Sequence, residues 1–109
     1  MPFDEATAAR VRRLLEESPG YAEKKMFGGL TFMVRGHMCC GVVNDELMVR
    51  VGVDQNEEAL SMPHVRPMDF TGKPMDGFVY VARGGVTSVH DLARWVDRGL
   101  KFNSSMPAK

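Results

Sequence analysis

The residues of this chain with the most reactive side chains are three histidines, two cysteines and carboxylates scattered over turns and helix faces. A metal site would need ligands at a regular spacing, such as i,i+4 on a helix or a CxxC pair, and His37, His64 and His90 have no such neighbours. Covalent catalysis would need a Ser or Cys beside a base, and no GxSxG-like turn precedes a helix. His37 and Cys39 lie two residues apart, but no third group orients them. Acid–base chemistry by two carboxylates stays open, yet nothing in the pattern indicates an enzyme, a metal or a cofactor.

The two cysteines, Cys39 and Cys40, are adjacent within a predicted strand. Neighbouring residues of a strand point to opposite faces, so these thiols are poorly placed to bond each other or to share a metal ion. We expect one reduced thiol in the core and one facing outward.

Glycine-rich phosphate binding is a weak alternative at Gly28–Gly29. Such a loop follows a strand and opens a helix, whereas this glycine pair leads into a strand, so no helix N-terminus is available for an anion. The pair is more typical of a bulge or of a close approach by another chain segment. No nucleotide-binding fingerprint of the doubly wound type is present either.

Five basic residues are candidate contacts for phosphate or for an acidic partner: Arg10, Arg12, Arg13, Lys24 and Lys25. On the first predicted helix, Arg12 is four residues from Glu16 and Arg13 is four residues from Glu17, which favours a solvated face with local ion pairs. The whole chain has 14 basic and 14 acidic residues, and this balance weakens the case for a dedicated nucleic-acid binder.

The composition is that of one globular domain. The 109 residues are 44% hydrophobic and 26% charged, and a chain of this length can bury a core without disulfides. We see no signal peptide or membrane-spanning segment and therefore expect a cytoplasmic protein.

Three strands dominate the pattern, over residues 30–35, 38–43 and 46–51. Period-two alternation places residues 30, 32 and 34 on one face and residues 31, 33 and 35 on the other. Gly36–His37 and Asn44–Asp45 are the expected turns, because these residue types tolerate tight hairpins. The result is a meander with one apolar face that needs helices to cover it.

The remaining segments provide those helices and two further strands. Asp4 is the expected N-cap of a helix that buries Ala8, Val11, Leu14 and Leu15 and ends at residues 18–20. A short helix over 55–61, with Asp54 as its cap, precedes a stretch of loop with an edge strand over 66–70, and a clear strand covers 77–82.

Ser88 is expected to begin the last helix, with Asp91 completing a capping box. Residues 89, 92, 93, 96 and 100 are expected to face the core, with Trp95 beside them, and the tail 103–109 is expected to fray.

Methionine is frequent, with nine residues in the chain. Met33, Met38 and Met48 fall in the meander, where they either fill the core or, if no helix covers their face, form an adaptable surface for a partner. Core packing is the favoured interpretation.

Several segments together resemble a known family. Residues 24–32, KKMFGGLTF, followed by Gly36, the turn 44–47, residues 72–75 (GKPM) and residues 92–96 (LARWV) are similar, in the same order, to the N-terminal domain of the TfoX/Sxy family. The similarity extends from residue 10 to residue 100, and its most specific part is the MFGG segment.

The resemblance implies a two-layer α+β domain with one antiparallel sheet of about five strands, in the order helix, three strands, helix, two strands, helix, similar to secretion chaperones. Family members are regulators of natural competence, thought to act as coactivators with the cyclic-AMP receptor protein. Full-length regulators carry a second domain, and this chain is expected to lack it, since it ends after the first.

We therefore expect a non-enzymatic, regulatory protein-interaction module. The candidate partner surface comprises Met26, Phe27, Gly28 and Gly29 with the loop residues Gly72, Lys73, Pro74 and Met75. Two alternatives stay open, a nucleic-acid-binding accessory protein and a small-molecule binder or enzyme with a pocket near Arg50, Tyr80 and His64. A homodimer through an exposed sheet edge or face is a further expectation.

Overall fold

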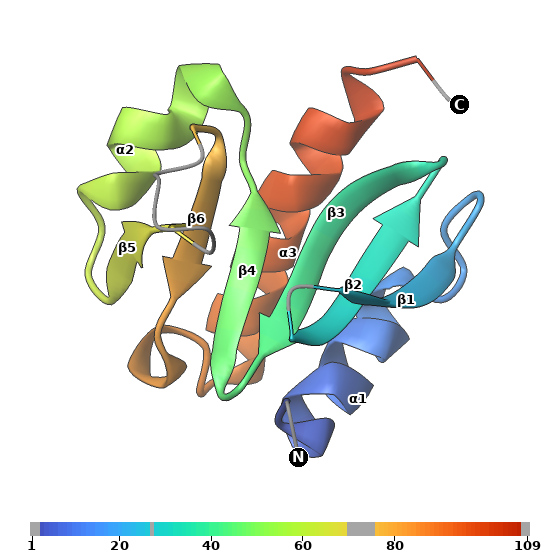
Figure 1. Ribbon diagram of the computed structural model, residues 1–109, viewed down its shortest axis with the longest axis horizontal. Coiled ribbons are helices and arrows are strands. Elements are labelled where there is room, and N and C mark those ends of the chain that lie inside the picture. The colour runs from blue at the N-terminus through green and yellow to red at the C-terminus, as the bar shows by residue number, and fades with distance from the viewer. Residues whose placement is uncertain (1–2, 27, 70–75, 108–109) are drawn as a thin grey trace.

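The protein is a single open antiparallel sheet with helices packed on one side of it (Figure 1). The computed structural model describes residues 3–26, 28–69 and 76–107. In chain order these residues form α1 (Glu5–Leu15), β1 (Ala22–Met26), β2 (Gly29–Val34), β3 (His37–Val43), β4 (Glu46–Arg50), α2 (Asn56–Leu60), β5 (Val65–Pro67), β6 (Phe78–Val81) and α3 (Val89–Ser104). Short 3₁₀ helices, η1 (Val53–Gln55) and η2 (Arg83–Gly85), precede α2 and α3. The strand order is β1-β2-β3-β4-β6-β5, which confirms the predicted α+β class.

The described residues form six strands where the sequence predicted about five, and the additional strand is β1. Its sequence, AEKKM, has no apolar alternation, because an edge strand that buries neither face needs none. β1 is recognisable only from its pairing with β2, in which Lys24 lies beside Thr31 and Lys25 beside Leu30.

The first predicted hairpin turn is shifted by one residue. Arg35 and Gly36 both have positive φ, 56° and 82°, and His37 already belongs to β3. Two consecutive positive φ values are the requirement of the tight turn whose twist matches antiparallel strands. The second turn lies where it was predicted, with Asn44 at φ 55°.

A bulge in β3 changes the predicted placement of the cysteines. Phe32 of β2 pairs with Cys40, but Met33 pairs with Met38, so Cys39 is an extra residue on β3. Such a residue breaks the alternation of side chains. Both thiols are consequently buried in the core beneath α3, and the prediction of one outward cysteine is wrong.

The two glycines of the MFGG segment serve different purposes, neither of them the predicted bulge. Gly28 has φ 75° and lies in the turn between β1 and β2. Gly29 is in β2, where a Cβ atom would run into the carbonyl oxygen of Val42, so the expected close approach of another segment is confirmed there.

The first helix is capped as predicted. The Asp4 carboxylate accepts a hydrogen bond from the Ala6 amide (3.1 Å) and another from the Thr7 hydroxyl (2.9 Å), and these bonds lower the pKa of Asp4. Leu14 was expected in the core but is 40% exposed, because the buried stripe is centred on Val11 and Leu15.

The later helices differ from the prediction at their ends. The predicted helix 55–61 is a 3₁₀ turn followed by α2, and no side chain caps either element, so Asp54 is not an N-cap. Ser88 caps α3 as predicted, because its hydroxyl accepts a hydrogen bond from the Asp91 backbone amide (3.0 Å). Val89, the first helical residue, is 67% exposed because the packed part of the helix begins one turn later, at Leu92.

α3 also continues beyond the predicted start of the tail. Asn103 is helical and buried, and its amide donates a hydrogen bond to the Val34 carbonyl (2.9 Å) while its own carbonyl accepts one from Arg35 (2.9 Å). These bonds tie the end of α3 to the β2–β3 hairpin.

The central strands are buried on both sides. On the helix-covered side, the core contains Phe32, Leu47 and Val49 beneath α1, α2 and α3. On the helix-free side, which faces the viewer in Figure 1, Met48, Met68 and Tyr80 form a second, smaller cluster.

Candidate interaction surfaces

A charged hollow of about 430 Å³ lies on the helix-free side of the sheet. Tyr80 of β6 and Glu46 of β4 contribute to its lining together with Arg66 of β5. The other lining residues come from turns and strand ends: Gly28, Val43, Asn44 and Asp69. The hollow is assembled by sheet register, because Arg66 pairs with Tyr80, and Glu46 lies two residues along β4 from Met48, the residue that pairs with Tyr80 on its other side.

The charges of this hollow are paired with each other. The Arg66 guanidinium binds the Glu46 carboxylate through two hydrogen bonds (2.6 and 3.1 Å), lies 3.5 Å from the Asp69 carboxylate and stacks over the Tyr80 ring at 4.4 Å. The bonds to Glu46 raise the pKa of Arg66. Burial raises the pKa of Tyr80, so its phenol stays neutral.

Part of the predicted partner surface borders this hollow. Gly28 lines the hollow, and so does Asp69, which comes three residues before Gly72 in the sequence. Met26 is partly exposed and Gly29 is buried. Phe27, Gly72, Lys73, Pro74 and Met75 lie outside the described residues.

The five basic candidates do not form one patch. Arg10 donates a hydrogen bond to the Thr87 carbonyl (3.2 Å), Arg12 reaches Glu23 of β1, and Arg13 is exposed on the outer face of α1. Lys24 and Lys25 are exposed on β1 and point to opposite faces of the sheet.

The predicted Arg12–Glu16 pair is replaced by a contact with the sheet, and the described residues show no ion pair between Arg13 and Glu17. Arg12 binds the Glu23 carboxylate through two nitrogens (2.5 and 2.9 Å), and the Tyr21 hydroxyl donates a hydrogen bond to the same carboxylate. The bond from Arg12 holds the pKa of Glu23 below its ordinary value. Burial and Glu23 raise the pKa of Tyr21.

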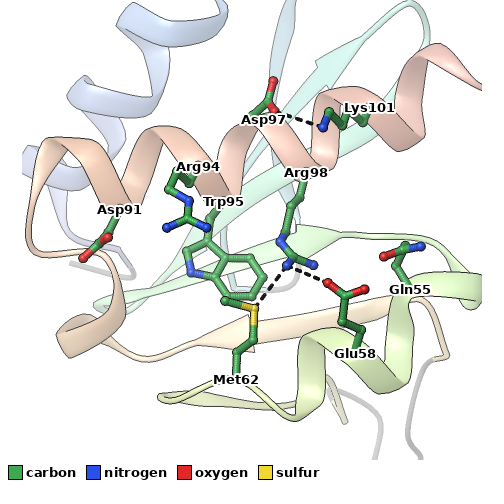
Figure 2. Close-up of a pocket in the computed structure, with 9 residues that line it drawn as sticks. All are labelled: Gln55, Glu58, Met62, Asp91, Arg94, Trp95, Asp97, Arg98 and Lys101. Atoms are coloured by element: carbon green, nitrogen blue, oxygen red, sulfur yellow. Dashed lines mark hydrogen bonds and ion pairs between the residues drawn. The ribbon is translucent and has the colours of Figure 1, made fainter.

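A second hollow, of about 350 Å³, is a groove between α2 and α3 (Figure 2). Arg98 spans it, with the guanidinium 5.1 Å from the centre of the Trp95 ring, 3.0 Å from Glu58 and 3.2 Å from the sulfur of Met62. Three acidic and three basic residues line the groove, so its charge is balanced: Glu58, Asp91, Asp97, Arg94, Arg98 and Lys101.

The predicted pocket near Arg50, Tyr80 and His64 is not formed by the described residues. Arg50 packs against the rings of Phe78 and Phe102, each at 5.3 Å, while Tyr80 lies beneath Arg66. His64 packs against the Gly84–Gly85 turn. These side chains therefore belong to three separate contacts.

Glu46, Arg66 and Asp69 form a cluster that was not predicted from the sequence. Only Arg66 and Asp69 had a local signal, as an i,i+3 pair of opposite charge. The contact with Glu46, twenty residues away, depends on the pairing of β4 and β5 with β6.

The methionines divide between the two predicted roles. Met48 and Met68 are fully buried, as core packing predicts, whereas Met33 and Met38 are partly exposed on the helix-free side. In the part of the chain that the structure describes, no three potential metal ligands of the His, Cys, Asp or Glu type come together. Among the same residues, no helix is both long and apolar enough to cross a bilayer.

The fold and these surfaces define a small α+β domain whose sheet carries helices on one side and a charged hollow on the other. A family model described as the TfoX N-terminal domain matches residues 13–103 of the 109. The chain therefore belongs to this family, and the resemblance seen in the sequence is confirmed. Neither the curated proteins nor the solved structures contain a significant match to the chain.

Proposed function

We propose that this protein is a non-enzymatic regulatory module that binds a protein partner through the helix-free side of its sheet. The observation that carries the proposal is the hollow around Arg66, where ionised side chains and an aromatic floor form a built, partly exposed surface. Arginine and tyrosine are residue types that contribute strongly to protein interfaces.

The chemistry of the hollow fits recognition better than catalysis. A general acid or base needs a pKa near the working pH. Here Arg66 stays cationic and Tyr80 stays neutral, because the pKa of each is raised. Arg66 is also bound to both neighbouring carboxylates, which fixes the shape of the hollow.

Partly exposed apolar side chains extend the surface beyond the hollow. Met26, Met33 and Met38 lie on the helix-free side of β1, β2 and β3. Flexible thioether side chains adapt to the shape of a partner. A charged hollow beside adaptable apolar contacts is a suitable combination for docking a protein.

Family membership supports the regulatory part of the proposal. The TfoX/Sxy resemblance implies regulators of natural competence that act as transcriptional coactivators, so a component of the transcription machinery is the proposed partner.

The test compares matched variants of the tagged protein in its native host. Arg66→Ala removes the centre of the hollow, and Arg13→Ala removes another exposed charge, from α1 on the helix-covered side of the sheet. Nuclease-treated pull-downs at moderate salt are read by mass spectrometry, after thermal denaturation has verified that each variant is folded. A double variant, Phe27→Ala with Lys73→Ala, tests the predicted residues that lie outside the described ranges.

We expect a stoichiometric protein with the unchanged protein and with Arg13→Ala, and a severalfold loss with Arg66→Ala and with the double variant. Equal recovery with Arg66→Ala would move the interface away from the hollow. Capture of no protein at all would contradict the proposed function.

A further inference from the structure

The two edges of the sheet differ in whether they can accept another strand. β5 is only three residues long and ends at Pro67, which has no amide hydrogen to donate. β1 at the other edge has five residues and no proline. Its described backbone bonds within the sheet all go to β2, and alternate residues of an edge strand turn their N–H and C=O groups outward.

The β1 edge is positively charged. Glu23, its acidic residue, is already bound by Arg12 and Tyr21. Lys24 and Lys25 are exposed, and neither forms an ion pair with any residue in the described ranges.

The two lysines lie on opposite sides of the sheet. Pairing with β2 puts Lys24 beside Thr31, on the helix-free side, and Lys25 beside Leu30, on the helix-covered side. A nucleic-acid backbone running over one face would reach only one of them. A strand added at the edge presents side chains to both faces and meets both lysines.

A second copy of the same strand is a poor occupant. Two-fold antiparallel pairing of β1 with itself places one residue opposite its own copy at the centre. If the centre is Glu23 or Lys25, like charges face each other directly, which is destabilising, and a centre at Lys24 adds the same repulsion beside two Glu23–Lys25 pairs. In these registers a second copy is a less favourable occupant than an acidic segment, while the homodimer expected from the sequence stays a prediction.

We propose that β1 accepts an extended acidic segment of a protein partner as an additional antiparallel strand. This inference rests on the proposed function and adds the kind of segment that is bound. The segment runs antiparallel to β1, so its N-terminal residue lies opposite Met26 and is apolar. Its next two residues are acidic and lie opposite Lys25 and Lys24. A neutral residue then lies opposite Glu23, and an apolar residue lies opposite Ala22. Main-chain hydrogen bonds supply the affinity and the two charge pairs select the sequence.

The probe is a fluorescent, end-capped peptide that contains Val-Glu-Glu-Thr-Val. Its controls are Val-Gln-Gln-Thr-Val and the acidic peptide with N-methyl groups on the alternate residues that would donate to β1. The test variant carries both Lys24→Glu and Lys25→Glu. The control variant carries Arg94→Glu and Lys101→Glu at exposed positions of α3, so that it has the same change in net charge. Fluorescence anisotropy at about 0.15 M salt, where the Debye length is only about 8 Å, measures affinity, and amide hydrogen exchange locates the binding.

We expect the acidic peptide to slow amide exchange in β1, and the Lys24/Lys25 variant to bind it about tenfold more weakly, because two attractive cross-strand pairs become repulsive. The α3 variant should keep its affinity within about twofold, since surface charges farther than a Debye length are screened. N-methylation should weaken binding by a similar factor or more.

Three results would overturn the inference. They are an equal loss with the α3 variant, undiminished binding of the N-methylated peptide, and tighter binding of a single-stranded oligonucleotide that depends on the same two lysines. The proposed function is judged separately, because Arg66→Ala tests the hollow in the pull-down. Loss of the partner with Arg66→Ala but not with the lysine variant, together with no peptide binding, would leave the function standing and remove the strand addition.

Discussion

The two sides of the sheet are both buried at their centre, but different elements bury them. On the helix-covered side, three helices from distant parts of the sequence close over Phe32 and Leu47. On the helix-free side, Met48 is equally buried, beside Met68 and Tyr80, yet no described helix lies there. The helix-covered side therefore holds the main core, while the helix-free side combines a small core with the charged hollow.

This difference separates the side that holds the main core from the side proposed for recognition. Residues that hold the helices on the sheet leave little surface for a partner. The helix-free side exposes part of its apolar and charged groups, as the proposed docking surface requires. Substitutions on the two sides should consequently differ in size and in kind.

The largest expected effect is at the centre of the helix-covered core. Phe32→Ala should lower the free energy of unfolding by about 4 kcal/mol, the usual range for a buried aromatic residue. Met48→Ala should lower it by about 3 kcal/mol, because neighbouring side chains of the small cluster can adjust. Urea denaturation measures both, with Leu14→Ala as an exposed control within about 0.5 kcal/mol. A larger loss for Met48→Ala would place the main core on the helix-free side.

The adjacent glycines provide the next comparison. Gly29→Ala should destabilise by about 3 kcal/mol, since the new methyl group would meet the Val42 carbonyl between two paired strands. At Gly28 a new Cβ atom would have open space around it. Gly28→Ala should therefore lower the free energy of unfolding by only about 1–2 kcal/mol, which is the strain of a positive φ in a residue with a Cβ atom. Thermal denaturation of both variants checks this order, and equal losses would argue against the close approach at Gly29.

Asn103 tests the attachment of α3 to the hairpin. Asn103→Ala should destabilise by about 2 kcal/mol, because the buried Val34 carbonyl would lose its hydrogen bond from the side chain. Ser104→Ala, at the next and exposed position, should change stability by less than about 0.5 kcal/mol. If the two variants are equally stable, the end of α3 is not held by this bond.

The smallest expected effect is a pH dependence at Glu23. Its pKa in the folded protein is lowered from an ordinary 4.5, chiefly by Arg12, so the contact stabilises above that ordinary value and is lost as the pH falls through the lowered one. At neutral pH the free energy of unfolding of the unchanged protein should be higher than that of Glu23→Gln by up to about 1 kcal/mol. The two should converge in acid. A difference that persists at low pH would show that ionisation of Glu23 is not its source.

Much of the fold could be predicted because its signals are local. The alternation over 30–35 and 46–51 gave two central strands within a residue of their ends, and Asp4 and Ser88 cap their helices as their side-chain chemistry predicts. The MFGG segment predicted the family, which the match over residues 13–103 confirms. The candidate site was predicted less well, because its charged residues come from different strands.

The errors share a physical cause. β1 has no periodicity of its own, and the extra residue at Cys39 is visible only as a break in the pairing of β2 with β3. The sequence predicted that Arg12 pairs with Glu16 on its own helix, but Arg12 instead binds the carboxylate of Glu23 on β1. In each case a contact between distant segments outweighed the local pattern.

The sequence by itself determined the family, the central strands, the caps of the first and last helices and the absence of net charge, since each depends on residue type and short-range spacing. Only the tertiary structure decided that Arg66 meets Glu46 over Tyr80, that both cysteines are buried, and that Lys24 and Lys25 stand on a free edge. Those features are set by strand order and register, which depend on how separate segments pack together.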